Sequence, residues 1–257
     1  MNRTLARSIL LAALSTGAGA LQAAPVTYQF TTAAYSGSTS GPGAVLGAGA
    51  QVSGTFVYDA AGTYLGASQT LGFGGQAALY GADSGGVAPL SQLQGTVAGW
   101  HFSDAMGWAG ISNDRFPNGA LSPQDFVQLS ADPYINSSND VLPSGYQRQL
   151  KGFDLGEYRL HNVRLFWGTG IAGAGDLVSS ESMPASLPDG AGRLALDFIP
   201  LYWANHAPYY RFTVLFSGLK VQEVTAVPEA SIWQMAGAGL LMMAAMARGR
   251  SRAARPR

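Results

Sequence analysis

A period of two in the placement of apolar residues is the feature that most constrains the fold of this chain. In residues 51–58, the side chains of Val52, Phe56 and Tyr58 fall on one face, and those of Ser53 and Thr55 fall on the other. Segments rich in β-branched and aromatic residues, most with the same alternation, lie at 26–32, 51–58, 93–102, 126–129, 158–167, 193–198 and 210–216. This pattern is typical of half-buried strands, and it predicts a mainly β domain, either an antiparallel β-sandwich or a jelly roll.

Stretches rich in glycine, serine, proline, asparagine and aspartate separate these segments. They predict loops at 36–49, 61–75, 81–91, 103–125, 131–149 and 168–192. Loops longer than about 12–15 residues are usually functional or mobile, so these are long for a minimal sandwich. Within 158–167 the alternation changes phase near His161, which predicts a β-bulge.

Charge is unevenly distributed along the 257 residues, although the 15 basic and 15 acidic residues balance overall. Residues 25–227 hold eight basic and fourteen acidic residues, a net charge of −6. A mildly acidic region without clustered Lys and Arg argues against nucleic-acid binding, which depends on cations that displace counterions. The absence of cysteine excludes disulfides, thiolate metal sites and a cysteine nucleophile.

The first 24 residues have the order of features that defines a secretory signal peptide. Arg3 and Arg7 precede an apolar run at 9–14, and small residues close the segment. We expect cleavage between residues 20 and 25. The alternative is a short retained anchor, but the apolar run is shorter than a membrane-spanning helix requires.

The other end of the chain predicts a membrane helix with a cationic tail. Residues 231–247 contain no charge, and as a helix they would span roughly 25 Å of the ~30 Å hydrocarbon layer. Five arginines follow at once: Arg248, Arg250, Arg252, Arg255 and Arg257. Such a cluster stays cytoplasmic, which would leave the middle of the chain beyond the inner membrane. A buried helix of a globular core is the alternative.

The residues before this helix carry a resemblance to a known sorting signal. Val227, Pro228 and Glu229, followed by the apolar helix and the arginine-rich tail, resemble the PEP-CTERM segment, which also bears the label ice-binding-protein C-terminal domain. The usual second proline is Ala230 here. The strand-type segment 53–59 is similar to one common in PEP-CTERM ectodomains.

The resemblance implies an exported protein of a Gram-negative bacterium that makes exopolysaccharide. Signal peptidase and an exosortase, a membrane-embedded cysteine protease, would be its processing partners. The protein would be held in the inner membrane transiently and then delivered to the cell surface or the extracellular matrix. The chain would then consist of a signal peptide (1–24), an exported β domain (25–226) and a sorting segment (227–257).

Motifs for chemistry are scarce. No Gly-x-Ser-x-Gly pentad is present, and His101, His161 and His206 lack the spacing of a zinc site, so we predict no catalytic or metal residue. Carboxylates that could act in pairs in glycoside hydrolysis lie at Asp104, Asp114, Asp125, Asp132, Asp140, Asp154 and Glu157. Most lie in turn-like sequences, where aspartate hydrogen-bonds its own backbone.

Two oxygen-rich stretches raise the possibility of a calcium site. Residues 112–114 read Ser-Asn-Asp, and residues 137–140 read Ser-Ser-Asn-Asp. Hard cations favour such ligands. No established calcium-binding spacing is present, so the alternative is a pair of ordinary Asx-turns, and we predict no required cofactor.

Two tryptophans in loop-like surroundings, Trp108 and Trp203, are the candidates for stacking on a sugar ring. Burial as loop anchors is their alternative role. The scarcity of catalytic motifs predicts a non-enzymatic protein, and the resemblance to PEP-CTERM proteins implies that it is exported and has a structural or adhesive role in an exopolysaccharide or biofilm setting. A carbohydrate-binding module and a polysaccharide hydrolase that uses two loop carboxylates are the alternatives.

Overall fold

A computed structural model describes residues 24–68, 77–82, 86–115, 124–131, 149–168, 177–203 and 211–224. The chain divides into two compact units, Met1–Glu223 and Val224–Arg257, and every described helix and strand belongs to the first. The predicted apolar run at 9–14 and the predicted sorting segment at 227–257 lie outside the described residues. None of the helices in the described ranges has the length and apolar character needed to cross a membrane.

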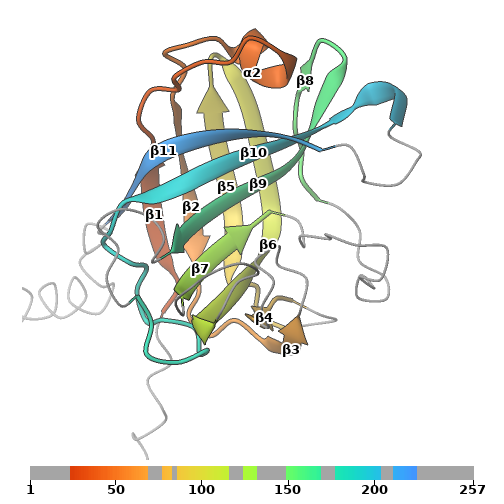
Figure 1. Cartoon of the computed structure of the whole chain (residues 1–257). Coiled ribbons are helices and arrows are strands. Elements are labelled where there is room, and N and C mark those ends of the chain that lie inside the picture. The colour runs from red at the N-terminus through yellow and green to blue at the C-terminus, as the bar shows by residue number, and fades with distance from the viewer. Residues whose placement is uncertain are drawn as a thin grey trace, which may run out of the picture. The chain divides into compact units, whose positions relative to one another are not determined.

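The described part of the first unit is built almost entirely of strands (Figure 1). Its elements are β1 (Val26–Thr31), α2 (Gly41–Leu46), β2 (Val52–Tyr58), β3 (Tyr64–Ser68), β4 (Ala77–Tyr80), β5 (Leu90–Val97), β6 (Trp100–Arg115), β7 (Gln124–Ser130), β8 (Asp154–Leu155), β9 (Tyr158–Gly168), β10 (Gly192–Pro200), η1 (Leu201–Trp203) and β11 (Phe212–Glu223).

Eight of the strands close into an antiparallel barrel. Their hydrogen-bonded order is β6-β5-β2-β1-β11-β10-β9-β7, and β7 pairs back to β6. Strands β4 and β3 extend the sheet from β6, and β8 pairs with β9. The predicted mainly β, antiparallel character is therefore confirmed, but the predicted sandwich or jelly roll is wrong.

The barrel closes because two long strands change partners along their length. Residues Trp100–Gly107 of β6 pair with β5, whereas Trp108–Arg115 pair with β7. Strand β11 pairs with β10 up to Leu219 and with β1 from Lys220 onward. Strands that pass from one sheet to another at a bend join two sheets into one continuous surface, which leaves none of the eight strands as an edge.

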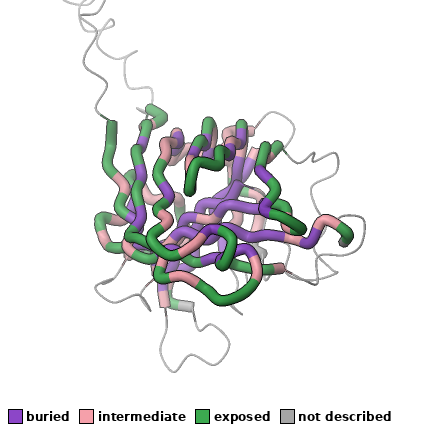
Figure 2. The backbone as a smooth tube through the Cα atoms, turned by 90° about the horizontal axis from the view of Figure 1, so that it is seen from above, coloured by how far each residue is buried: buried purple, intermediate pink, exposed green. Residues whose placement is uncertain are grey.

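These partner changes divide the barrel into two walls. The first wall consists of β1, β2, β5 and residues 100–107 of β6, and the second consists of β7, β9, β10, residues 108–115 of β6 and residues 212–219 of β11. Figure 2 shows buried and exposed residues alternating along some strands, while other strands are buried almost without interruption. In β7, for example, six of the seven residues are buried.

The interior is packed with aromatic and aliphatic side chains. The predicted apolar face of residues 51–58 is confirmed, because Val52, Phe56 and Tyr58 are at most 1 % exposed. The Phe56 ring lies 5.6 Å from Tyr28 and 6.0 Å from Phe30 between ring centroids. Burial of such large rings supplies much of the stability of a barrel that has no disulfide.

The predicted bulge in β9 is also confirmed. Asn162 pairs with Asp197 and Leu160 pairs with Phe198, so His161 has no counterpart on β10. The extra residue reverses the alternation, and this reversal lets both Leu160 and Val163 reach the core.

The strand and loop boundaries around residue 100 differ from the prediction. Residues 93–102 form parts of two strands joined by a tight turn, and the predicted loop at 103–125 holds most of β6. The turn residues Ala98 and Gly99 have φ of 47° and 85°. A two-residue hairpin of this kind needs positive φ at both positions, and Asn-Gly is its usual sequence signal. The Ala-Gly pair here lacks that signal.

Candidate functional site

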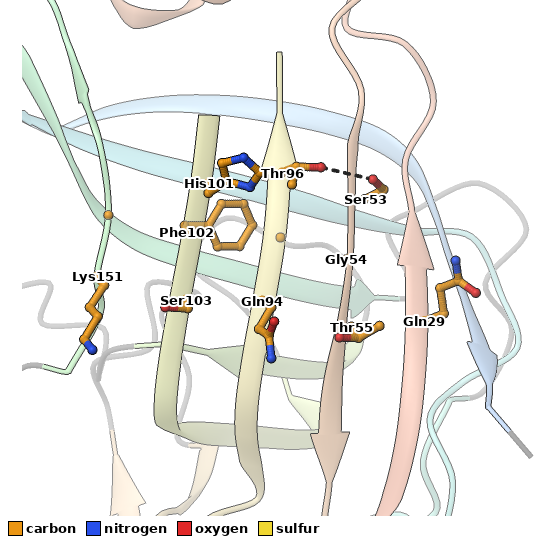
Figure 3. A pocket seen from close by; sticks show the side chains of 12 residues that line it. Gln29, Ser53, Gly54, Thr55, Gln94, Thr96, His101, Phe102, Ser103 and Lys151 are labelled. Atoms are coloured by element: carbon orange, nitrogen blue, oxygen red, sulfur yellow. Dashed lines mark hydrogen bonds between the residues drawn. The ribbon is translucent and has the colours of Figure 1, made fainter. Parts of the chain in front are cut away.

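The outer face of the first wall carries two parallel rows of polar side chains. The strand register aligns Thr31, Ser53, Thr96 and His101 in the first row. It aligns Gln29, Thr55, Gln94, Ser103 and Lys151 in the second row. Figure 3 shows members of both rows lying side by side across neighbouring strands.

The alternation of each strand places these polar residues outside. On β1, β2 and β6 the opposite parity holds Phe30, Phe56 and Phe102, which are 3 % exposed or less. Because successive side chains of a strand point to opposite faces, burial of these rings turns the intervening hydroxyl and amide groups outward. Within the first row, the hydroxyl groups of Ser53 and Thr96 lie 3.4 Å apart and form a hydrogen bond.

A hollow of about 700 Å³ lies between and around the two rows. The lining residues are Gln29, Ser53, Gly54, Thr55, Gln94, Gly95, Thr96, His101, Phe102, Ser103, Lys151 and Gly152. A neighbouring hollow of about 650 Å³ shares Gln94, Ser103 and Lys151 with it. The two together form an open trough across the wall.

Two glycines, Gly54 and Gly95, pair with each other between the rows. A Cβ atom at Gly95 would collide with the Phe102 ring, and one at Gly54 would collide with the carbonyl oxygen of Gln94 and with Phe30. Glycine is therefore required for the close approach of these strands and rings. The floor of the trough is backbone, and the polar rows form its sides.

Segment 149–152 closes one side of the trough. The Lys151 amide donates to the Ser103 carbonyl at 2.8 Å, and the Ser103 amide donates to the Lys151 carbonyl at 3.0 Å. This pair of hydrogen bonds fixes the backbone of Lys151 at the rim, where its side chain is exposed. Of the lining residues that the structure describes around the 700 Å³ hollow, none is an aspartate or glutamate.

An exposed aromatic ring begins β6 on the face opposite the polar rows, because Trp100 has the parity of the buried Phe102 and not that of His101. Trp100 precedes His101 on β6, and its ring stacks on Phe153, with 5.6 Å between centroids and an interplanar angle of 20°. Phe153 in turn follows Gly152, which lines the trough. Trp100 remains 44 % exposed, so Phe153 supports the ring while part of it faces solvent.

The two predicted sugar-stacking residues are placed differently. Trp108 is only 2 % exposed, and Gly81 leaves the space that its ring occupies. A ring so deeply buried offers no face to a sugar, so the structure gives Trp108 the packing role that was its alternative. Trp203 ends η1, and its side chain lies outside the described residues.

Three of the described candidate carboxylates, those of Asp104, Asp125 and Asp154, accept hydrogen bonds from backbone amides or from an arginine. Asp125 accepts the amides of Asp114 and Leu177 at 2.7 and 3.1 Å. Asp104 accepts the Met106 amide at 2.9 Å. Asp154 forms a two-bond ion pair with Arg159. The Asp104 contact, to the amide two residues along the chain, is that of a turn aspartate, whereas Asp125 and Asp154 link segments that are further apart in the sequence. Asp132 and Asp140 lie outside the described residues.

The calcium prediction stays a prediction. Residues 112–114 belong to the end of β6, whereas residues 137–140 lie outside the described ranges. Within the described part of the chain, no group of three or more His, Asp or Glu side chains could hold a metal ion. His161 lies at the bulge, and His206 lies outside the described residues.

The sorting residues Val227, Pro228 and Glu229 and the five tail arginines also lie outside the described residues. Comparison with known proteins finds no matching family model, no similar curated protein and no similar solved structure. The trough is therefore the described feature that best indicates a function.

Proposed function

We propose that this protein is an exported polysaccharide-binding protein whose barrel holds a glycan chain in the trough of the first wall. Two rows of polar side chains over a glycine floor are the observation that carries the proposal. The proposal joins the predicted adhesive role in an exopolysaccharide matrix with the carbohydrate-binding alternative, and it assigns no catalysis.

The chemistry of the trough suits sugars. Gln29 and Gln94 each offer both a donor and an acceptor, and the serine and threonine hydroxyls can rotate to serve as either. Sugar hydroxyls need such paired donors and acceptors.

Paired substitutions in the purified full-length protein test this proposal. Affinity for a panel of polysaccharides is measured by affinity electrophoresis and calorimetry for the wild type, Gln29→Ala and Gln94→Ala, both at residues that line the trough. We expect Gln94→Ala to weaken binding about tenfold, which corresponds to about 1.4 kcal/mol. Tyr64→Ala is the control, because Tyr64 is 57 % exposed and lies on β3, outside the first wall. Binding that survives both trough substitutions, or that falls equally with the control, would contradict the proposal.

The export route is proposed from the two ends of the chain. The signal peptide at 1–24 delivers the β domain across the inner membrane, residues 231–247 hold it there, and a sorting protease acts near Pro228 and Glu229. Replacing the five tail arginines with glutamine should weaken retention and orientation, because these charges keep the tail cytoplasmic. Fractionation with mass spectrometry of the mature ends measures the outcome, and unchanged retention would count against this route.

A further inference from the structure

We infer that the trough is built for an acidic polysaccharide, whose carboxylate groups meet Lys151. This inference rests on the proposed glycan-binding function and specifies its ligand class. It follows from three observations on the described residues: the charges of the first wall, the position of Lys151 and the length of the trough.

The outer face of the first wall differs in charge from the rest of the exported region. Residues 25–227 carry a net charge of −6. The side chains in the two rows are hydroxyls, amides, His101 and Lys151, and Lys220 pairs with Thr31 at the far end of the first row. Among these described outward positions none is acidic, so an anionic ligand meets no repulsion there.

The acidic residue nearest to the two rows along the chain is buried. Asp104 follows Ser103 on β6, pairs with Leu93 of the core and is only 4 % exposed. One of its carboxylate oxygens accepts a hydrogen bond from the Met106 amide at 2.9 Å. Asp104 lines the neighbouring hollow, but it is buried there rather than presented to solvent.

Lys151 is the fixed cation of the trough. Its backbone is tied to Ser103 in both directions, and its side chain is exposed and forms no ion pair with any described residue. An ammonium group with no carboxylate partner among the described residues is available to a ligand, and a hydrogen bond between charged groups is about twice as strong as a neutral one.

The length of the trough favours a polymer over a small metabolite. The second row runs from Gln29 on β1 to Lys151 across four strand-to-strand spacings. At about 4.8 Å for each spacing, this row is roughly 19 Å long. A ligand that contacts the whole row must therefore be an oligosaccharide or a longer chain, with one carboxylate at the Lys151 end.

A matched set of polymers and variants tests the inference on the full-length protein. The probes are polygalacturonate, alginate and hyaluronan, each beside its carboxyl-reduced, neutral form. We expect the wild type to bind at least one acidic polymer more than tenfold tighter than its reduced form. Lys151→Gln should weaken binding to that polymer about fivefold and leave binding to the reduced form within twofold. Arg193→Gln on β10 of the second wall is the control for loss of one positive charge.

The outcomes separate the two proposals. Equal or tighter binding of the neutral forms overturns the acidic ligand class while leaving the glycan-binding function standing. No binding of either form overturns both. Competition by inorganic polyphosphate at the same charge concentration would show that charge alone is recognised, which also overturns the inference. An unchanged affinity of Lys151→Gln for the acidic polymer removes Lys151 from the site.

Discussion

Removing the buried carboxylate of Asp197 should destabilise the barrel far more than removing an exposed one. The carboxylate is fully buried on β10 and forms three hydrogen bonds. Arg164 on β9 donates two of them, at 2.7 and 2.9 Å, and the Thr213 hydroxyl on β11 donates the third at 2.6 Å. The three residues join adjacent strands of the second wall.

The expected loss follows from what the substitution leaves behind. In Asp197→Ala the guanidinium of Arg164, whose side chain is 12 % exposed, loses its counter-charge in a poorly hydrated position. Breaking a buried pair from one side costs about 3–5 kcal/mol. For a domain of this size each 1 kcal/mol changes Tm by about 2–4 °C, so we expect a decrease of roughly 6–20 °C.

The chain provides its own control pair. Arg159 and Asp154 also form a two-bond contact across neighbouring strands, but their side chains are 53 % and 44 % exposed. Asp154→Ala should therefore cost less than about 1 kcal/mol. The assay is urea denaturation followed by tryptophan fluorescence, with the thermal midpoint as a second readout.

The comparison has clear refuting outcomes. Equal losses in the Asp197 and Asp154 variants would refute the argument from burial. The combined variant Arg164→Met with Asp197→Leu should recover most of the stability, because apolar residues of similar volume replace a buried pair at little cost. If the combined variant is as unstable as Asp197→Ala, the loss reflects packing rather than an uncompensated charge.

Two further predictions concern the interior of the barrel. Gly95→Ala should cost about 1–3 kcal/mol, because its Cβ collides with the Phe102 ring, whereas Gly190→Ala, with open space around it, should stay within about 0.5 kcal/mol in the same denaturation assay. Burial raises the pKa of Tyr58 above the ordinary 10.0, so its contribution is fully present below pH 10 and is lost as pH rises further. The free energy of unfolding of Tyr58→Phe should fall less steeply above pH 10 than that of the wild type, by up to about 1.4 kcal/mol per pH unit.

Strands with one buried face were predictable, because apolar residues on the buried face alternate with polar residues on the exposed face. Residues 51–58 alternate as a strand of the first wall should, and the phase change at His161 marks a bulge that the pairing confirms. In the second wall, side chains on both faces of β7 are buried, Asp125 and Gln128 among them. A strand that is buried on both faces does not alternate between apolar and polar residues, so the pattern used for the prediction is missing there.

Closure of the barrel was not predictable from the same pattern. A sandwich and a barrel share strands with one apolar face, and they differ in whether a strand changes partner at a bend. On β6 the change falls at Gly107 and Trp108, inside a stretch whose Gly, Ser and Asp content predicts a loop. The same residues that permit the bend therefore led to the prediction of a loop instead of a strand.

The arrangement of side chains in the candidate site was even less predictable from the sequence than the closure of the barrel. Each strand alone predicts which of its residues face out, but no strand predicts that Thr55 stands beside Gln94 and Gln94 beside Ser103. That register depends on the close packing of Gly95 against Phe102 beneath the trough. If the rows bind a glycan, Gly95→Ala should therefore weaken binding as well as stability even at temperatures where the variant remains folded. If the folded variant binds with wild-type affinity, glycan binding does not depend on the register of the rows.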